Sequence, residues 1–212
     1  MRIGILIIAA LILASPTIAQ TSAPSSAAPP AINIPSSQGI VAKLDTDLDA
    51  SKNKPGDLVQ AETTRDLKPG HDVLLKRGSI LSGHITQVQT YSSSSASMIV
   101  IVFDQVAPKG GSPATLNVKI QALAPAATVS TDSLQDGRGM AATNINSAVA
   151  GENRNLGNGG EIMATSVGVY GIRGMSLASS TQNQKQYSVV QSGVSDVKLK
   201  KGTQLVFRAP EQ

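Results

Sequence analysis

The sequence contains no cysteine and no tryptophan, and its aromatic share is only 2%. Without cysteine, the chain can form no disulfide, has no thiol chemistry and offers no sulfur for lipid attachment. With so few rings, its core must consist of Val, Ile, Leu and Ala, which bury less area per residue than aromatic side chains do. We therefore expect a shallow interior built on β-sheet.

Carboxylates are also scarce, since 14 Asp and Glu oppose 18 Lys and Arg, which gives a formal net charge of +4 over 212 residues. The cations are scattered along the chain, and few aromatic residues are available to stack on bases. The composition therefore predicts no nucleic-acid partner. A chain of this length, less a leader and a tail, fits one domain with a real core.

The first 38 residues have the composition of a leader followed by a tether. Arg2 precedes an apolar run from Ile3 to Ala14, and Thr17–Ala19 ends in small residues, as a signal-peptidase site does. The alternative is an uncleaved anchor, but the apolar run is shorter than the roughly 20 residues that span a bilayer. We expect residues 1–19 to be a cleaved signal peptide and residues 20–38 an Ala/Ser/Pro-rich tether. The mature chain would then be exported and either periplasmic or associated with the outer membrane.

One sequence pattern occurs twice in the chain. Residues 73–81 and 197–205 share V-x-L-K-[RK]-G-[ST]-x-L, in which a β-rich run meets two cations, a glycine and a hydroxyl residue. Glycine can adopt positive φ, Ser or Thr can hydrogen-bond the nearby backbone, and the cations can stay in water. The pattern therefore predicts two structural turns in two related β units. The residues assigned to these turns are Lys76, Gly78, Ser79, Lys201, Gly202 and Thr203.

Alternating polar and apolar residues predict strands at residues 40–49, 58–64, 80–89, 115–123 and 187–191 and after the second repeat. Residues 98–103 are apolar on both faces, which is typical of a central strand that is covered on both sides. Gly83 inside a predicted strand indicates a bulge or a close backbone approach. Because no adequate crossover helix separates these strands, we expect an all-β fold, an antiparallel barrel or sandwich, in a single domain at residues 39–212.

Residues 125–188 have a different composition, with many Ala, Ser, Asn and Gly. We expect a long insertion before the last strands, flexible or partly helical, with a flexible loop at Gly151–Gly160. Two pieces, Met140–Val149 and Glu161–Ala178, could be helical. The second is too polar and too rich in glycine for a transmembrane helix.

Asp45, Asp47 and Asp49 repeat the spacing of the first ligands in an EF-hand calcium loop. The match ends there, because Ala50 stands where the sharp turn needs glycine and Gly56 stands where a bidentate Glu belongs. We interpret the three carboxylates as the solvated face of a strand and expect no metal site.

Catalytic groups are equally hard to assemble from this sequence. His71 and His84 are the chain's two histidines, and without cysteine a zinc site would need carboxylates at unspecified distances. Ser79, His84 and Asp104 could be named as a triad, but no nucleophile motif surrounds the serine. No phosphate-binding loop, dinucleotide fingerprint or paired-carboxylate motif is present. We therefore expect no catalytic residue, no cofactor and no enzymatic activity.

Several short stretches resemble one known family. They are Gly56–Ala61, Leu75–Gly83, the strand end Val102–Asp104 and Lys201–Leu205. In sequence and order they are similar to the C-terminal β-barrel of TrbI-type subunits, the bridging scaffold components of conjugation and type IV secretion machines. The resemblance covers residues 40–124 and 187–208. It implies a barrel behind a proline-containing tether, with an insertion that in the family carries a helical antenna reaching the outer membrane.

Taken together, the sequence predicts an exported, non-enzymatic β-barrel with a structural or assembly role in the cell envelope, in a secretion or conjugation machine. Its partners would be envelope proteins or further copies of itself, with peripheral contact to the outer membrane through residues 140–178. The alternative is a ligand-binding module that recognises glycan or peptidoglycan. The scarcity of aromatic rings, which commonly stack on sugars, counts against that alternative.

Overall fold

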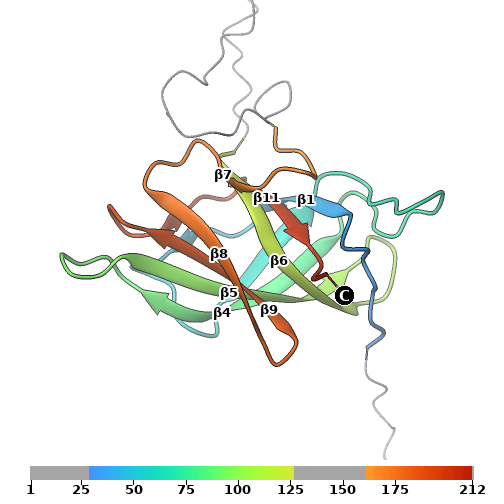
Figure 1. Ribbon diagram of the computed structural model, residues 1–212. Coiled ribbons are helices and arrows are strands. Elements are labelled where there is room, and N and C mark those ends of the chain that lie inside the picture. The colour runs from blue at the N-terminus through green and yellow to red at the C-terminus, as the bar shows by residue number, and fades with distance from the viewer. Residues whose placement is uncertain (1–28, 127–160, 212) are drawn as a thin grey trace, which may run out of the picture.

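The computed structural model describes residues 29–126 and 161–211, which form strands and turns (Figure 1). The barrel strands are β1 Gly39–Leu44, β3 Leu58–Thr63, β4 Ile80–Gln89, β5 Ser97–Ala107, β6 Ala114–Ala124 and β11 Gln204–Arg208. They run in the order β6-β11-β1-β3-β4-β5, and β5 also pairs with β6, so the sheet closes on itself. All pairings around the ring are antiparallel. The predicted all-β antiparallel barrel is confirmed.

The interior of the barrel is mainly aliphatic. Along β6, the buried Val118 and Ile120 alternate with more exposed residues, because successive side chains of a strand point to opposite faces. Phe103 and Phe207 are both buried, and their rings meet edge to face with centroids 4.7 Å apart. Residues 99–103 are all buried, which confirms the expected central strand.

The barrel consists of two related units. In one, β1 pairs with β11 and β11 pairs with β6; in the other, β3 pairs with β4 and β4 pairs with β5. The two units meet at the antiparallel pairing of β1 with β3, where Ala42, Lys43 and Leu44 lie opposite Thr63, Glu62 and Ala61. The units therefore share one pairing pattern and are joined through their first strands.

Both units change register at equivalent places. β4 shifts against β5 between Ser82 and Gly83, and β11 shifts against β6 between Val206 and Phe207. A Cβ at position 83 would overlap the carbonyl oxygen of Val102, so glycine is required there and the predicted irregularity is confirmed. The equivalent position in the other unit carries Phe207, whose ring lies in the barrel core.

The single strand expected at residues 40–49 is wrong, because two strands occupy this range. β1 ends at Leu44, and β2, Leu48–Asp49, pairs with β10, Lys198–Leu199, in a separate two-stranded sheet. Between them, the Asp45 N–H donates to the Gln60 carbonyl oxygen at 2.8 Å. Polar and apolar residues keep alternating between β1 and β2. The sequence pattern therefore could not show that the second strand pairs with a different partner.

The chain contacts the barrel before β1 begins. The Ile32 N–H donates to the Thr115 carbonyl oxygen at 2.9 Å, and Ile34 is buried in the core cluster. The last part of the expected tether therefore packs against the folded unit. The predicted signal peptide and residues 20–28 lie outside the described residues.

The helical alternative for Glu161–Ala178 is wrong. This range contains β7, Gly168–Val169, and the start of β8, Met175–Gln182. Gly168, Gly171 and Gly174 all have positive φ, which a right-handed helix does not contain. Nowhere in residues 29–126 or 161–211 is there a helix long and apolar enough to cross a membrane.

Part of the region expected to be an insertion belongs to the main sheet. β9, Lys185–Ser192, pairs with β5, and β8 pairs with β9 (Figure 1). Ahead of these strands, Ile162 and Tyr170 join a second buried cluster with side chains of β1, β6 and β11. Met140–Val149 and Gly151–Gly160 lie outside the described residues.

Candidate functional site

The two repeated turns have the same backbone geometry. Gly78 and Gly202 have φ of 84° and 88°, in the left-handed region that favours glycine. The Gly78 N–H donates to the Thr63 carbonyl oxygen at 2.8 Å, and the Gly202 N–H donates to the Leu44 carbonyl oxygen at 2.7 Å. Thr63 and Leu44 are the last residues of β3 and β1, so each turn is fastened to the end of the equivalent strand.

A carboxylate also holds each turn. Asp66 Oδ1 accepts a hydrogen bond from the Arg77 N–H at 2.8 Å, and Asp47 Oδ1 accepts one from the Lys201 N–H at 2.6 Å. The leucine after each aspartate pairs with the leucine ahead of the turn, Leu67 with Leu75 and Leu48 with Leu199. Sequence reasoning missed Asp66 and placed Asp47 on a solvated face. The repeated Asp-Leu dipeptide was the available signal.

The first turn is completed by buried hydroxyl groups. Ser79 is fully buried, and its Oγ donates to the Lys76 carbonyl oxygen at 2.7 Å and accepts from the Lys109 N–H at 3.0 Å. Thr63 Oγ1 donates to the same Lys76 carbonyl oxygen and accepts from the Ser79 N–H, both at 2.9 Å. The Lys76 side chain is exposed to solvent. Ser79 therefore serves the turn through its hydroxyl, and Lys76 through its backbone.

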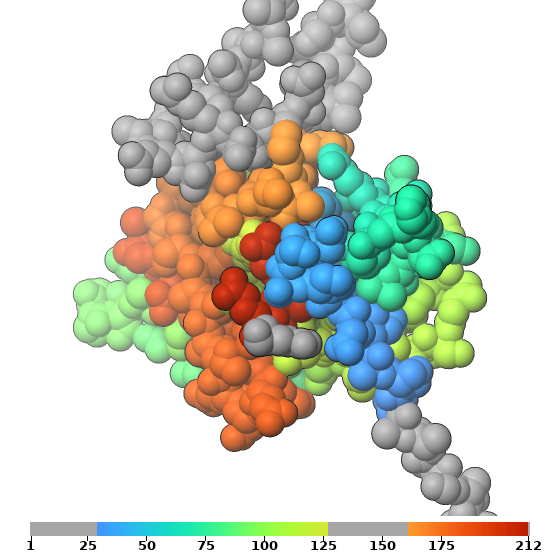
Figure 2. Space-filling model, turned by 45° about the vertical axis from the view of Figure 1, so that its right-hand side comes forward, coloured from blue at the N-terminus to red at the C-terminus, as the bar shows by residue number. Residues whose placement is uncertain are grey.

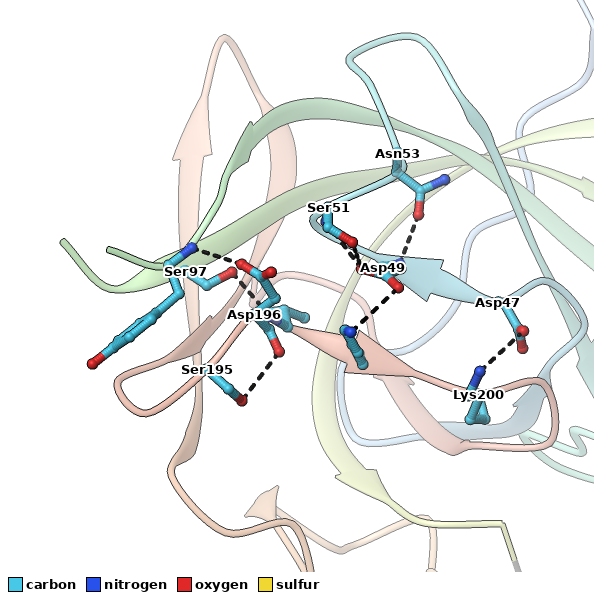
Figure 3. A network of polar contacts seen from close by, with 11 residues as sticks. Asp47, Asp49, Ser51, Asn53, Ser97, Ser195, Asp196 and Lys200 are labelled. Atoms are coloured by element: carbon cyan, nitrogen blue, oxygen red, sulfur yellow. Dashed lines mark hydrogen bonds and ion pairs between the residues drawn. The ribbon is translucent and has the colours of Figure 1, made fainter. Parts of the chain in front are cut away.

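The second turn is completed by a ladder of exposed ion pairs instead. Lys201 Nζ lies 2.6 Å from Asp45 Oδ1, Lys200 Nζ lies 3.6 Å from Asp47 Oδ2, and Lys198 Nζ lies 3.8 Å from Asp49 Oδ2. Figure 3 shows Asp47 and Lys200 facing each other, with Asp49 further along the segment of Asp47, in β2. We call these six residues the ion ladder.

The ion ladder shifts the pKa of its carboxylates in one direction. The hydrogen bond and charge of Lys201 lower the pKa of Asp45, and Asp45 in turn raises the pKa of Lys201. The Lys201 backbone N–H lowers the pKa of Asp47, and hydrogen bonds from Ser51 lower the pKa of Asp49. Each interaction favours the charged form, so the ladder is ionised at neutral pH.

The aspartates of the ladder, whose spacing imitates a calcium loop, are engaged in ion pairs. Each carboxylate faces a different lysine along the ladder. Among the described side chains, no group of His, Asp and Glu is placed to hold a metal ion. The alternation that suggests calcium ligands serves ion pairing between β2, β10 and the loops beside them.

Polar contacts continue from the ion ladder to the end of the β4–β5 hairpin (Figure 3). Ser51 Oγ donates to Asp49 Oδ1 at 2.6 Å, and Asn53 Oδ1 accepts from the Asp49 N–H at 2.7 Å. Further along, Ser97 Oγ accepts from the Val197 N–H at 2.9 Å, and Asp196 Oδ1 accepts from the Tyr91 N–H at 2.7 Å. These bonds join the segment before β10 to both ends of the β4–β5 connection.

Two of the groups that could be named as a triad, Ser79 and Asp104, are engaged in other contacts. Ser79 makes the contacts of its turn, while Asp104 Oδ2 lies 3.7 Å from Lys185 Nζ. His84 sits on β4 opposite Leu58 of β3. The serine and the aspartate therefore serve separate parts of the structure.

The other histidine, His71, is exposed in the loop that leads to the first turn. This loop borders a shallow, open hollow of about 270 Å³ lined by Pro69–Leu74. Ligand sites usually occupy about 300 to 1,000 Å³ and place several convergent polar groups around the ligand. The hollow holds one imidazole and no aromatic ring that could stack on a sugar.

The fold and its turns define a closed, six-stranded β-barrel built of two units with the same strand pairing, in which polar side chains fasten the first strands to the last. No known protein family and no curated protein matches the sequence. Among solved structures, the chain is similar to ComB10 of the Com type IV secretion system of Helicobacter pylori. The identity is 16% and the TM-score 0.38, over 81% of this chain and 84% of that chain.

Proposed function

We propose that this chain is an exported, non-enzymatic β-barrel with a structural or assembly role in the cell envelope. The observation that carries the proposal is the use of the polar residues at the repeated turns. Asp66 and the hydroxyls of Thr63 and Ser79 bind the backbone of the first turn, and the ion ladder joins the β2 and β10 segments beside the second turn. These contacts brace the barrel, as a scaffold requires.

Export is supported by the leader pattern of residues 1–19, with its short apolar run and small residues at the end. A barrel without cysteine must keep its fold in an oxidising compartment by packing and hydrogen bonding alone. Closure of the sheet provides this, because a closed barrel has no unpaired edge within its ring.

We extend the proposal to membership of a secretion or conjugation machine. Its support is the sequence resemblance to TrbI-type barrels, whose stretches occupy defined places in this structure. Leu75–Gly83 forms the first turn and the irregular start of β4, and Lys201–Leu205 forms the second turn and the start of β11. The proposed partners are envelope proteins or further copies of the chain, and contact with the outer membrane through residues 140–178 stays part of the proposal.

The test is crosslinking in intact cells that produce the native chain, followed by separation of envelope and soluble fractions. We expect the protein in the envelope fraction, with amine-reactive crosslinks from exposed lysines such as Lys200 to other envelope proteins or to another copy. A chain lacking residues 1–19 is the control and should stay in the cytoplasm. Recovery of the native chain as an uncrosslinked, soluble cytoplasmic protein would overturn the proposal. Copurification with peptidoglycan without protein crosslinks would favour the ligand-binding alternative.

A further inference from the structure

β8 is the terminal strand of the nine-stranded sheet on the side away from β7. It pairs with β9 along its whole length, from Met175 opposite Ser192 to Gln182 opposite Lys185. Among the described residues, no strand pairs with its other edge. In Figure 2 the deep orange atoms of this hairpin form a lobe at the lower side of the molecule, and Ala178–Gln182 are all exposed. We call the unpaired side of β8 the β8 edge.

The hairpin geometry determines which backbone groups point to the β8 edge. Asn183 and Gln184 have φ of 49° and 64°, so they form a two-residue turn of the I′ kind, which closes on a hydrogen-bonded pair. Hydrogen-bonded and non-hydrogen-bonded pairs then alternate along an antiparallel ladder. The bond from the Gly193 N–H to the Gly174 carbonyl oxygen agrees with this phase. The N–H and C=O of Leu177, Ser179 and their odd-numbered neighbours therefore point to the β8 edge.

The composition of β8 leaves this edge open to pairing. Natural sheets protect exposed edges with charged residues, especially lysine, with proline, or with short strands. β8 has eight residues, Met-Ser-Leu-Ala-Ser-Ser-Thr-Gln, with no charged residue and no proline. Its first part is anchored, because Met175 and Leu177 pack against the main core cluster. The edge is thus held in place by the barrel and is chemically suited to accept another strand.

We propose that two copies of this chain associate by antiparallel pairing of their β8 edges, an inference that rests on the assembly role proposed above. Residues that point to a shared edge must oppose one another, so pairings centred on Ala178 and on Ser179 overlap equally. We take the Ala178 register, because it includes Met175 at the anchored end of β8 and leaves out Gln182 beside the turn. Leu177 then pairs with Ser179 of the second copy, and Ala178 faces its own equivalent across the two-fold axis.

β8 suits pairing with its own copy because it carries no charge. In an antiparallel pair of identical strands, each charged residue near the centre would lie opposite a like charge. A lysine or glutamate near the centre would face a like charge, which destabilises a cross-strand pair. β8 has neither, and the residue at the centre is the small Ala178. The flanking positions place Ser176 opposite Ser180, a pair that can hydrogen-bond across the strands. An isologous contact of this kind closes into a dimer.

The first experiment compares Ser179→Pro with Ser179→Ala by sedimentation velocity over a concentration series of the full mature chain. Proline removes an N–H that points to the β8 edge and leaves the bonds to β9 intact, whereas alanine keeps the N–H. We expect the wild type and Ser179→Ala to form dimers at the same concentrations. Ser179→Pro should stay monomeric at concentrations at least ten-fold above those at which the wild type dimerises. A monomeric wild type, or equal dimerisation of the two variants, would overturn the proposal.

A charge-pairing experiment keeps the inference testable if proline also disturbs the hairpin. Ala178→Lys and Ala178→Glu each place two like charges face to face, so each variant alone should be monomeric. An equimolar mixture of the two should recover the dimer, because opposite charges then meet at the centre. Failure of the mixture to recover the dimer would refute pairing through this edge. If the chain is found in the envelope but is strictly monomeric, only the dimer inference is refuted. If it is a dimer but is found in the cytoplasm, only the proposed function is refuted.

Discussion

Replacing Gly78 or Gly202 with valine tests the two repeated turns directly. Both glycines have positive φ, and a β-branched residue in that region costs about 1 to 3 kcal/mol. Valine also reduces the entropy of the unfolded chain, which offsets up to about 1 kcal/mol. We therefore expect a net loss of about 1 to 2 kcal/mol in the free energy of unfolding for each variant.

The surroundings predict which variant loses more stability. A Cβ at position 78 would lie 3.2 Å from Cδ of Lys109, a flexible side chain that can move aside. A Cβ at position 202 would lie 3.2 Å from Cβ of Ala126, which can move only together with its backbone. Gly202→Val should therefore be at least as destabilising as Gly78→Val.

Urea unfolding of the mature chain, with the midpoint and slope fitted for each variant, gives the measurement. Gly56→Val is a control for backbone strain alone, because Gly56 has φ of 95° and nothing within 4 Å of its Cβ position. Gly70 has neither a positive φ nor an atom within 4 Å of its Cβ position, and Arg77 has an exposed side chain. Gly70→Val and Arg77→Gln should therefore each shift stability by less than about 0.5 kcal/mol. Unchanged midpoints for Gly78→Val and Gly202→Val would refute the structural role of these turns. If Arg77→Gln or Lys201→Gln then abolished envelope association, the motif would be a basic binding loop.

Three further predictions concern the bulge, the ion ladder and the leader. Gly83→Ala should cost about 1 to 3 kcal/mol in urea unfolding because its Cβ overlaps the Val102 carbonyl oxygen, whereas the neighbouring Ser82→Ala should be nearly neutral. The pKa of Asp45 is lowered from 3.8 by Lys201, so its stabilisation is complete above that value and is lost as pH falls through the folded-state pKa. Asp45→Asn should therefore flatten the acid limb of a stability-against-pH curve. N-terminal mass spectrometry of exported protein should find a chain that starts at Gln20 or within a few residues of it, and an intact Met1–Ala19 would contradict the leader.

Local patterns predicted the parts of this fold that local chemistry determines. The repeated glycines require positive φ wherever they lie, and Gly83 marks a close backbone approach without any knowledge of its partner strand. The apolar run at residues 98–103 indicated burial on both faces, and β5 is an interior strand of the sheet that lies between β4 and β9. These features could be predicted because each has a local sign in the sequence, a glycine or an apolar run, even where its structural partner is distant.

The parts that sequence reasoning missed depend on contacts between distant residues. Ser176–Ser180 gave no strand signal, because serine and alanine have low β-propensity and β8 forms only against β9. Asn117 helps to place this hairpin, since its side chain donates to the Gln184 carbonyl oxygen and accepts from the Gln186 N–H. Nothing near Asn117 in the sequence indicates a partner almost 70 residues later.

The two turns have the same backbone geometry but are completed by different side-chain contacts. The difference shows how the ion ladder contributes to the fold. The first turn closes with the buried hydroxyls of Thr63 and Ser79, over a short separation in sequence. The second must bring the end of the chain to its beginning, and the bond from Lys201 to Asp47 spans 154 positions. Lysines on one segment and aspartates on the other favour pairing between unlike segments, since either segment would repel its own kind. A one-residue slip would also move Leu199 out of its buried place opposite Leu48, so charge selects the partner and the leucines fix the register.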